Sequence, residues 1–270
     1  MNITFIGGGN MATAIIGGLI QRGWDKAALN AVEIVPAARD KLAQTFGIRT
    51  FAAIDKDALA VDCIVLAIKP QQMREAARAL APHVKNTLVV TIAAGIRAGD
   101  LSRWLGGNTR IVRVMPNTPA LVLAGVSGLY ALPGVSNDDR ERAASILAAV
   151  GETVWVEKES DIDTVTAVSG SGPAYVFYFI EALEQAGREM GLSATAAKQL
   201  AIATFTGSSK LAAQSSEDAA TLRARVTSKG GTTERAIASM EGADIKAAIV
   251  HAVKAAQARS VELGDELGKD

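Results

Sequence analysis

The chain has 270 residues, 49% of them hydrophobic, with 28 basic and 28 acidic side chains. This length allows one large domain or two modest ones, each with a buried core. The formal net charge of zero, with Lys and Arg scattered along the chain, gives no reason to expect nucleic acid as a partner.

The first half of the chain alternates between predicted strands and predicted helices. Short apolar runs predict strands at residues 3–6, 31–35, 63–68, 88–92, 110–114, 125–132 and 153–156. Amphipathic stretches between them predict helices at 11–21, 37–46, 71–80, 100–105 and 138–150. This alternation predicts an α/β fold with a doubly wound parallel sheet, covered by helices on both faces.

The second part of the chain, after about Glu159, has a different character. No convincing strand is found there. One helix is expected at Pro173–Met190, ended by Gly191, and Ser193 can cap a second helix that runs to about Gln214. We therefore predict two domains, a dinucleotide-binding domain at 1–159 and an all-helical domain at 160–270.

A glycine-rich loop follows the first predicted strand. The segment "IGGGNMA" has the pattern Gly7-x-Gly9-x-x-Ala12 between a strand and a helix, which is typical of a Rossmann-like dinucleotide site. Gly7 allows the tight turn, Gly9 lets the backbone approach a pyrophosphate, and Ala12 permits close packing of helix on sheet. The predicted cofactor contacts in this loop are Ile6, Gly7, Gly8, Gly9, Asn10 and Met11.

The second predicted strand should end beside the adenosine ribose. Glu33 lies there, and an acidic side chain suits the free 2′-hydroxyl of NADH. Arg39 and Lys41 follow closely and could meet the 2′-phosphate of NADPH, or they could simply be solvated helix residues. The sequence leaves the choice between the two cofactors open.

Three further strand ends carry unusual segments, "AIKP", "IAAGI" and "MPNTPA". In a doubly wound sheet, ligands bind outside the carboxyl ends of the strands. Each segment alone could be no more than a stiff turn, but three at the same edge favour contact with a cofactor. The candidate residues are Ala67, Ile68, Lys69, Pro70, Ala93, Ala94, Gly95, Asn117 and Thr118.

The segment "TSKGGTTERAI" stands out in the helical half. Its glycine pair leaves backbone N–H groups uncovered in front of a predicted helix, and Thr232 and Thr233 add hydroxyl groups. Glu234 can help to cap that helix. The pattern fits a cradle for a carboxylate and fits a plain capping loop equally well.

Other residues argue against metal, membrane and secretion. His83 and His251 are too few and too far apart to suggest a metal site, and Cys63 lies in an apolar run, as expected of a buried thiol in the reducing cytoplasm. The N-terminus lacks the pattern of a signal peptide, and no apolar run approaches the roughly 20 residues of a membrane helix. We therefore expect a soluble cytoplasmic protein.

Taken together, these motifs resemble the pyrroline-5-carboxylate reductase family. The resemblance rests on "FIGGGNMA", "AIKP", "IAAGI", "RVMPNTPA", "VTAVSGSGPAYVF" and "VTSKGGTTERAIASME", which occur in the family's order over nearly the whole chain. One departure is Lys229, which stands where the family usually has proline and adds a positive charge to the loop.

The resemblance implies an activity and an assembly. L-1-pyrroline-5-carboxylate would be reduced to L-proline by hydride from NADPH or NADH, the last step of proline biosynthesis. The family's assemblies are homodimers, sometimes joined into a ring such as a decamer. Neither nucleic acid nor membrane is implied as a partner.

The resemblance also implies roles for single residues. Thr233 would place its hydroxyl near the ring nitrogen, and the backbone from Ser228 through Gly230, Gly231 and Thr232 would hold the carboxylate. Glu159 matches a position among the family's ligand contacts, and Asp55 would lie near the cofactor.

Two other functions compete with this interpretation. A β-hydroxyacid dehydrogenase would share the fold, but such enzymes use Lys-x-x-x-Asn on a helix. Here Lys198 is followed at that spacing by Ile202, and Lys210 by Gln214. A non-catalytic dinucleotide sensor would bind cofactor and leave the Gly230–Gly231 loop idle.

Overall fold

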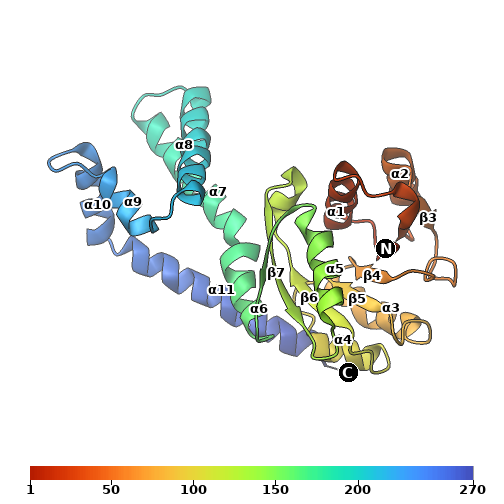
Figure 1. Cartoon of the computed structure of the whole chain (residues 1–270). Coiled ribbons are helices and arrows are strands. Elements are labelled where there is room, and N and C mark those ends of the chain that lie inside the picture. The colour runs from red at the N-terminus through yellow and green to blue at the C-terminus, as the bar shows by residue number, and fades with distance from the viewer. Residues whose placement is uncertain (270) are drawn as a thin grey trace. The chain divides into compact units, whose positions relative to one another are not determined.

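The computed structural model describes residues 1–269 and divides into two compact units (Figure 1). The first unit holds Met1–Ser171 together with the segment that begins at Ala256, and the second holds Gly172–Ala255. This division differs from the predicted domains 1–159 and 160–270. The helix just after Glu159 packs on the sheet, and the end of the last helix returns to the first unit.

One sheet of eight strands runs through the first unit, in the order β3-β2-β1-β4-β5-β6-β7-β8. The strands are β1 (Ile3–Ile6), β2 (Leu29–Val32), β3 (Arg49–Phe51), β4 (Cys63–Leu66), β5 (Leu88–Thr91), β6 (Ile111–Met115), β7 (Gly125–Ala131) and β8 (Gly151–Trp155). The neighbours among β1 to β6 pair in parallel, as predicted. The short edge strand β3 was not predicted, because its three residues carry no apolar pattern.

The last two strands correct the prediction of a parallel sheet. β7 pairs with β6 antiparallel, and β8 pairs with β7 in parallel. The reason is the short connection between β6 and β7, which holds only a 3-10 turn at Thr118–Val122. A parallel neighbour would need a crossover of a dozen or more residues, usually with a helix.

The end of β2 also differs from the predicted strand at 31–35. β2 ends at Val32, so Glu33 lies in the turn and the apolar pair Ile34 and Val35 is exposed. Pro36 then begins α2, and its fixed φ suits the first turn of a helix. The predicted strand was too long because Ile34 and Val35 are apolar, although neither side chain is buried.

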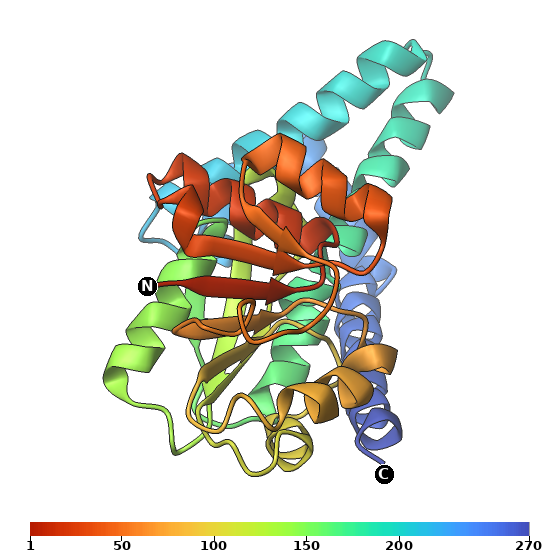
Figure 2. The ribbon, with the colours of Figure 1, turned by 90° about the vertical axis from the view of Figure 1, so that its right-hand side faces the viewer.

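Helices cover both faces of the sheet, as predicted (Figure 2). Cys63 and Val65 of β4 lie in one apolar cluster, and Ile64 and Leu66 lie in the other, because successive side chains of a strand point to opposite faces. The first cluster takes residues from α1 (Asn10–Gln21), α2 (Pro36–Phe46) and α5 (Asn137–Ala148). The second takes residues from α3 (Met73–Leu80) and α4 (Ala98–Trp104).

The second unit is helical throughout, as predicted. It contains α7 (Gly172–Glu189), α8 (Ala194–Gln214), α9 (Ala219–Arg225), α10 (Thr232–Gly242) and the first part of α11 (Ile245–Leu267). Gly191 takes φ +100° in the turn after α7, and the hydroxyl of Ser193 caps α8. Among the described residues, no helix combines the length and apolar character that crossing a membrane requires.

The large apolar side chains of the second unit are unusually exposed. Phe177 and Tyr178 of α7 are 66% and 71% exposed, and Leu211 of α8 is 67% exposed. Apolar surface of this extent on a soluble protein marks an interface. The single chain therefore leaves a face on these helices that a partner would cover.

An ion pair between Arg110 and the buried carboxylate of Asp139 ties α5 to the start of β6. Asp139 of α5 is 2% exposed, and both of its carboxylate oxygens accept hydrogen bonds from the guanidinium of Arg110 at 2.9 Å. These hydrogen bonds hold the pKa of Asp139 below its usual value. Nearby, burial raises the pKa of the Cys63 thiol, so it stays protonated at neutral pH, as expected of a buried cysteine.

We expect Asp139→Asn to lower the free energy of unfolding by about 2 kcal/mol at pH 7, because charge-assisted hydrogen bonds to Arg110 are lost. The lowered pKa means that the carboxylate contributes its full stability above about pH 4, the unfolded value, and loses it as the pH falls through the folded value. Denaturant unfolding at several pH values should therefore show a difference that shrinks below about pH 4. A difference that grows on acidification would contradict this account.

Candidate functional site

The predicted ligand loops gather at one edge of the sheet. β1, β4, β5 and β6 are parallel neighbours, so their carboxyl ends meet at the same edge. The N–H of Ala67 donates to the carbonyl of Ile6 at 2.8 Å, and that of Ile92 donates to Leu66 at 3.1 Å. The four segments at 6–9, 67–70, 92–95 and 115–118 are therefore brought together as the sequence predicted.

The glycine loop after β1 has the geometry that a dinucleotide requires. Gly7 takes φ +97°, and a Cβ there would lie 2.7 Å from the carbonyl oxygen of Ala67, so only glycine fits. Gly9 is the N-cap of α1 and supplies no side-chain cap. A Cβ added at Gly9 would meet no atom within 4 Å, so the space before the N–H groups of Asn10 and Met11 is open.

Glu33 lies on the glycine loop itself. Its Oε2 accepts a hydrogen bond from the N–H of Gly8 at 2.9 Å, and its Oε1 accepts one from Val35 at 2.8 Å. The guanidinium of Arg39 donates to the carbonyl oxygen of Glu33 at 3.0 Å. The carboxylate is therefore held in place at the end of β2, where the ribose of a dinucleotide would lie.

The loops after β4 and β5 differ in how tightly they are packed. After Lys69, Pro70 begins a 3-10 turn. Gly95 takes φ +74°, and a Cβ there would lie 2.9 Å from Leu267 Cδ1, so the end of α11 packs directly against this loop. Ala93 is buried beneath the loop, and Ala94 is exposed on it.

The side chains of Asn117 and Asp55, two predicted cofactor contacts, form hydrogen bonds with the protein backbone. The Oδ1 of Asn117 accepts from the N–H of Val126 at 2.9 Å, and its Nδ2 donates to the carbonyl of Ser169 at 3.2 Å. The carboxylate of Asp55 accepts from the N–H of Ala58 at 2.8 Å. Thr118, next to Asn117, is exposed. Asn117 and Asp55 thus shape their loops, and Thr118 remains accessible.

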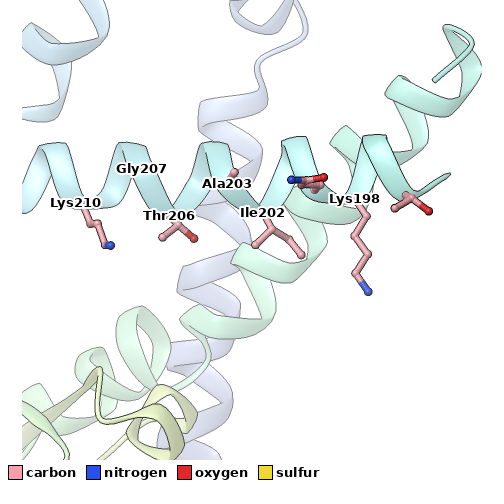
Figure 3. A pocket seen from close by; sticks show the side chains of 8 residues that line it. Lys198, Ile202, Ala203, Thr206, Gly207 and Lys210 are labelled. Atoms are coloured by element: carbon pink, nitrogen blue, oxygen red, sulfur yellow. The ribbon is translucent and has the colours of Figure 1, made fainter. Parts of the chain in front are cut away.

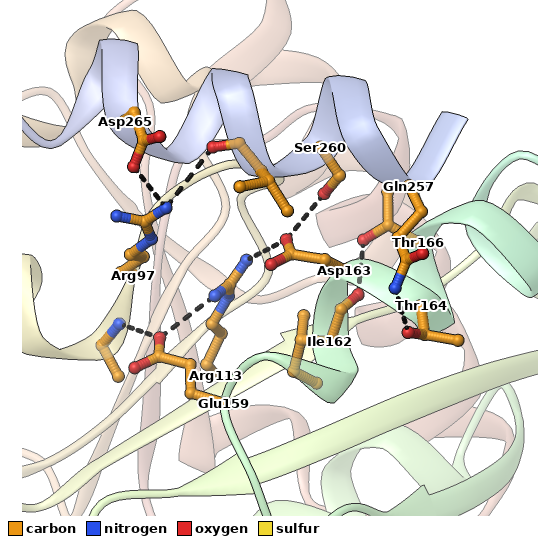
Figure 4. A network of polar contacts seen from close by, with 12 residues as sticks. Arg97, Arg113, Glu159, Ile162, Asp163, Thr164, Thr166, Gln257, Ser260 and Asp265 are labelled. Carbon is orange, nitrogen blue, oxygen red and sulfur yellow. Dashed lines mark hydrogen bonds and ion pairs between the residues drawn. The ribbon is translucent and has the colours of Figure 1, made fainter. Parts of the chain in front are cut away.

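Glu159 belongs to a polar network that the sequence did not reveal (Figure 4). Its Oε1 accepts from the N–H of Ala98 at 2.5 Å and from the guanidinium of Arg113 at 3.1 Å. Arg113 also lies 3.6 Å from Asp163, which accepts from the hydroxyl of Ser260 at 2.8 Å. An arginine inside the apolar strand "IVRVM" was the one signal for such a network.

The second unit presents its own glycine loop between α9 and α10. Gly230 takes φ +73°, and Gly231 is the N-cap of α10 and supplies no side-chain cap. The carboxylate of Glu234 accepts a hydrogen bond from the N–H of Gly230 at 2.6 Å, one residue before the N-cap, so it ties the loop to α10 and caps no N–H of the helix itself. The N–H of Gly231 donates to the carbonyl of Ser228 at 3.0 Å, so the two glycine N–H groups are not uncovered as predicted. The N–H groups of Thr232 and Thr233 begin the helix, where the dipole favours an anion.

A shallow groove of about 630 Å³ runs along one face of α8 (Figure 3). All of its lining residues belong to α8: Thr195, Lys198, Gln199, Ile202, Ala203, Thr206, Gly207 and Lys210. A groove bounded by a single helix is an open helix face. It contains none of the predicted site residues.

Comparisons with protein families match both parts of the chain. Residues 159–263 match the family model described as pyrroline-5-carboxylate reductase dimerisation. Residues 2–95 match the model described as NADP oxidoreductase, coenzyme F420-dependent. The two matches cover the helical part and most of the parallel strands.

Individual proteins are similar over the whole chain. Pyrroline-5-carboxylate reductase from Pseudomonas aeruginosa is 44% identical over 99% of this chain and 98% of that protein. The structure of a pyrroline-5-carboxylate reductase from Coxiella burnetii is 39% identical, with a TM-score of 0.93, over 97% of this chain and 98% of that one. The Plasmodium falciparum pyrroline carboxylate reductase with NADP bound is 29% identical, with a TM-score of 0.86, over 98% of each chain.

We expect Gly7→Ala to destabilise the protein by at least about 2 kcal/mol, because it adds both a strained φ and a clash with Ala67. Gly9→Ala is the matched control, since its Cβ meets nothing in the free protein. That variant should unfold like the wild type and bind NADH at least tenfold more weakly, because the methyl group occupies the space before the helix. Thermal unfolding and NADH titration measure the two effects. Equal NADH affinity in Gly9→Ala and wild type would contradict a pyrophosphate at this position.

Proposed function

The chain belongs to the pyrroline-5-carboxylate reductase family, and we propose that its two glycine loops hold the two reactants of that reaction. The enzyme reduces L-1-pyrroline-5-carboxylate to L-proline with NADPH or NADH, the last step of proline biosynthesis. The observation that carries the assignment is the match of reductases to this chain over nearly its full length, and it is supported by the four motif loops of the first unit, which lie at one edge of the sheet. The assignment of roles to single residues is our proposal.

The dinucleotide is held at the edge of the sheet in the first unit. The open N–H groups of α1 receive the pyrophosphate, and Glu33 accepts hydrogen bonds from the ribose hydroxyls. The backbone at 67–70 and 93–95 lines the nicotinamide end, and Thr118 with Asn117 closes the edge at β6. When bound, the reduced nicotinamide supplies the hydride that adds to the imine carbon.

The substrate carboxylate is held at the start of α10. The backbone of Ser228, Gly230, Gly231 and Thr232 shapes the cradle. The N–H groups of Gly230 and Gly231 donate to Glu234 and Ser228, so the N–H groups of Thr232 and Thr233, with the helix dipole, receive the anion. Lys229, where the family usually has proline, contributes a positive charge to the same loop. Held by the backbone at the start of α10 and by the charge of Lys229, the carboxylate fixes which face of the ring is presented to the hydride.

Thr233 acts at the ring nitrogen. A protonated cyclic imine accepts hydride readily, so the enzyme needs orientation more than a strong acid. The hydroxyl of Thr233 donates a hydrogen bond to the nitrogen as it becomes an amine. Because a threonine hydroxyl is a very weak acid, the proton itself comes with the substrate or from solvent.

The protein acts as a dimer. The dimerisation family matches residues 159–263, which include the exposed apolar side chains of α7 and the open face of α8. A second copy of the chain therefore covers these helices. We propose that dimers assemble further, as in a decamer, and that the enzyme works in the cytoplasm.

The assay that tests the function mixes purified protein with pyrroline-5-carboxylate and NADH or NADPH and follows the absorbance of the reduced cofactor. Turnover is expected with pyrroline-5-carboxylate and none with β-hydroxyacids. Cofactor binding without turnover on either substrate would instead identify a dinucleotide sensor.

Thr233→Ala should lower kcat by about tenfold, the cost of one hydrogen bond, and leave the Kd of NADH unchanged. Thr233→Ser, which keeps the hydroxyl, is the control, and an unaltered kcat in Thr233→Ala would remove Thr233 from the mechanism.

We further propose that Glu33 favours NADH. Its carboxylate accepts hydrogen bonds from Gly8 and Val35 at the end of β2, so a 2′-phosphate there would lie beside a like charge. Glu33→Gln should shift the ratio of kcat/KM for NADPH over NADH upward by about tenfold, or about 1.4 kcal/mol. Arg39→Ala tests the alternative, in which Arg39 binds the 2′-phosphate of NADPH. If the wild type prefers NADPH and Arg39→Ala abolishes that preference, then Arg39 binds the 2′-phosphate and our proposal is wrong.

A further inference from the structure

Arg113 is the centre of a buried charge cluster in the first unit. It lies on the inner strand β6, its side chain is 2% exposed, and β5 and β7 flank it in the sheet. A guanidinium in such a position is costly unless carboxylates compensate its charge. Glu159 and Asp163 supply those carboxylates, one on each side of the guanidinium, as Figure 4 shows.

Glu159 does more than neutralise Arg113. The same oxygen that faces Arg113 accepts the N–H of Ala98, the first residue of α4. Arg97, the N-cap of that helix, makes no side-chain cap, so Glu159 caps α4 from a distant part of the chain. Ala98 ends the short loop that begins after β5 and carries Ala93, Ala94 and Gly95, the proposed nicotinamide contacts. The carboxylate therefore fixes one end of that loop.

The last turns of α11 hold the same loop from the other side. Gly95 packs against Leu263 and Leu267, with no room for a Cβ, and the guanidinium of Arg97 forms an ion pair with Asp265 at 2.6 Å. Inside the first unit, Ser260 of α11 donates to Asp163, which lies beside Arg113. The loop is thus clamped between the sheet and the end of α11.

We propose that Glu159 is a positioning residue, which with Arg113, Asp163 and Ser260 holds the nicotinamide loop in place for hydride transfer. This inference rests on the proposed function, because the loop at 93–98 matters only if the nicotinamide lies against it. It differs from the role that the family resemblance implies, in which Glu159 contacts the ligand. In this structure, the Oε1 of Glu159 accepts its hydrogen bonds from Ala98 and Arg113, which both belong to the protein.

Hydride transfer is sensitive to this kind of support. The reacting carbons must approach within about 3–3.5 Å, and a displacement of about 1 Å can cost on the order of 100-fold in rate. Loosening the loop should therefore slow the chemical step more than it weakens the binding of either reactant. A direct substrate contact would behave in the opposite way, since its loss raises KM.

The experiment compares Glu159→Ala, Glu159→Gln and Ser260→Ala with the wild-type dimer. Glu159→Ala should lower kcat by about tenfold, change the KM for pyrroline-5-carboxylate by less than about twofold, and raise the isotope effect on kcat with NADH deuterated at the transferred position. Glu159→Gln, which keeps an acceptor for Ala98, should lose less. Ser260→Ala, which touches only Asp163 in the network, should change kcat in the same direction by about two- to threefold.

Matched controls separate positioning from general damage. Glu152→Ala removes an exposed glutamate on β8, and Ser145→Ala removes an exposed hydroxyl on α5, so both should keep wild-type kinetics. A rise of tenfold or more in the KM for pyrroline-5-carboxylate, with kcat unchanged, would identify Glu159 as a substrate contact and overturn the proposal. Wild-type kinetics in Ser260→Ala would overturn the link to α11.

A second measurement does not depend on turnover. If the wild type fails to reduce pyrroline-5-carboxylate, the proposed function fails, and the loop can still be observed through the nicotinamide fluorescence of bound NADH. At saturating NADH we expect lower intensity and lower polarisation in Glu159→Ala than in the wild type, because the ring is less restrained. Identical fluorescence in the two proteins would contradict the positioning role even when the variant is fully folded.

Discussion

The candidate cofactor site depends on one close approach, that of Gly7 to the end of β4. Parallel pairing of β1 with β4 puts the carbonyl of Ala67 where a side chain at residue 7 would lie, so the chain must leave β1 through a left-handed glycine. That turn directs α1 across the sheet edge and leaves its first N–H groups uncovered. The loops after β4, β5 and β6 then close around the same edge, and Glu33 is tied to it through Gly8.

Much of this arrangement could be predicted from the sequence because it rests on local rules. Glycine spacing, strand–helix alternation and the caps at Gly191 and Ser193 each depend on a few neighbouring residues. The errors came from long-range causes. β7 runs antiparallel because its connection is too short for a crossover. β2 ends at Val32, and the next residue, Glu33, bonds to Gly8 in a loop 25 residues earlier in the chain. The partners of Arg113 lie dozens of residues away, and no spacing rule encodes them.

The two units divide the chemistry between them. In the function that we propose, the first unit supplies backbone and the carboxylate of Glu33 for a large, polyanionic cofactor, and the second supplies a glycine loop and two threonine hydroxyls for a small acid. The proposed mechanism assigns no side chain of either loop as the proton donor, because the substrate carries its own proton. Two arginine–carboxylate pairs, Arg110–Asp139 and Arg113–Glu159, instead hold elements of the first unit together.

The uncovered apolar side chains of α7 and α8 tie folding to the amount of protein present. In a dimer that covers these helices, Phe177, Tyr178 and Leu211 would gain their burial from the second chain, so the stability of the helical unit would depend on protein concentration. Dilution would separate the dimer and lower the stability of the helical unit. The first unit has its own core on both faces of the sheet and would keep its packing. The first unit would then be stable by itself, whereas the stability of the helical unit would depend on the meeting of two copies of the chain.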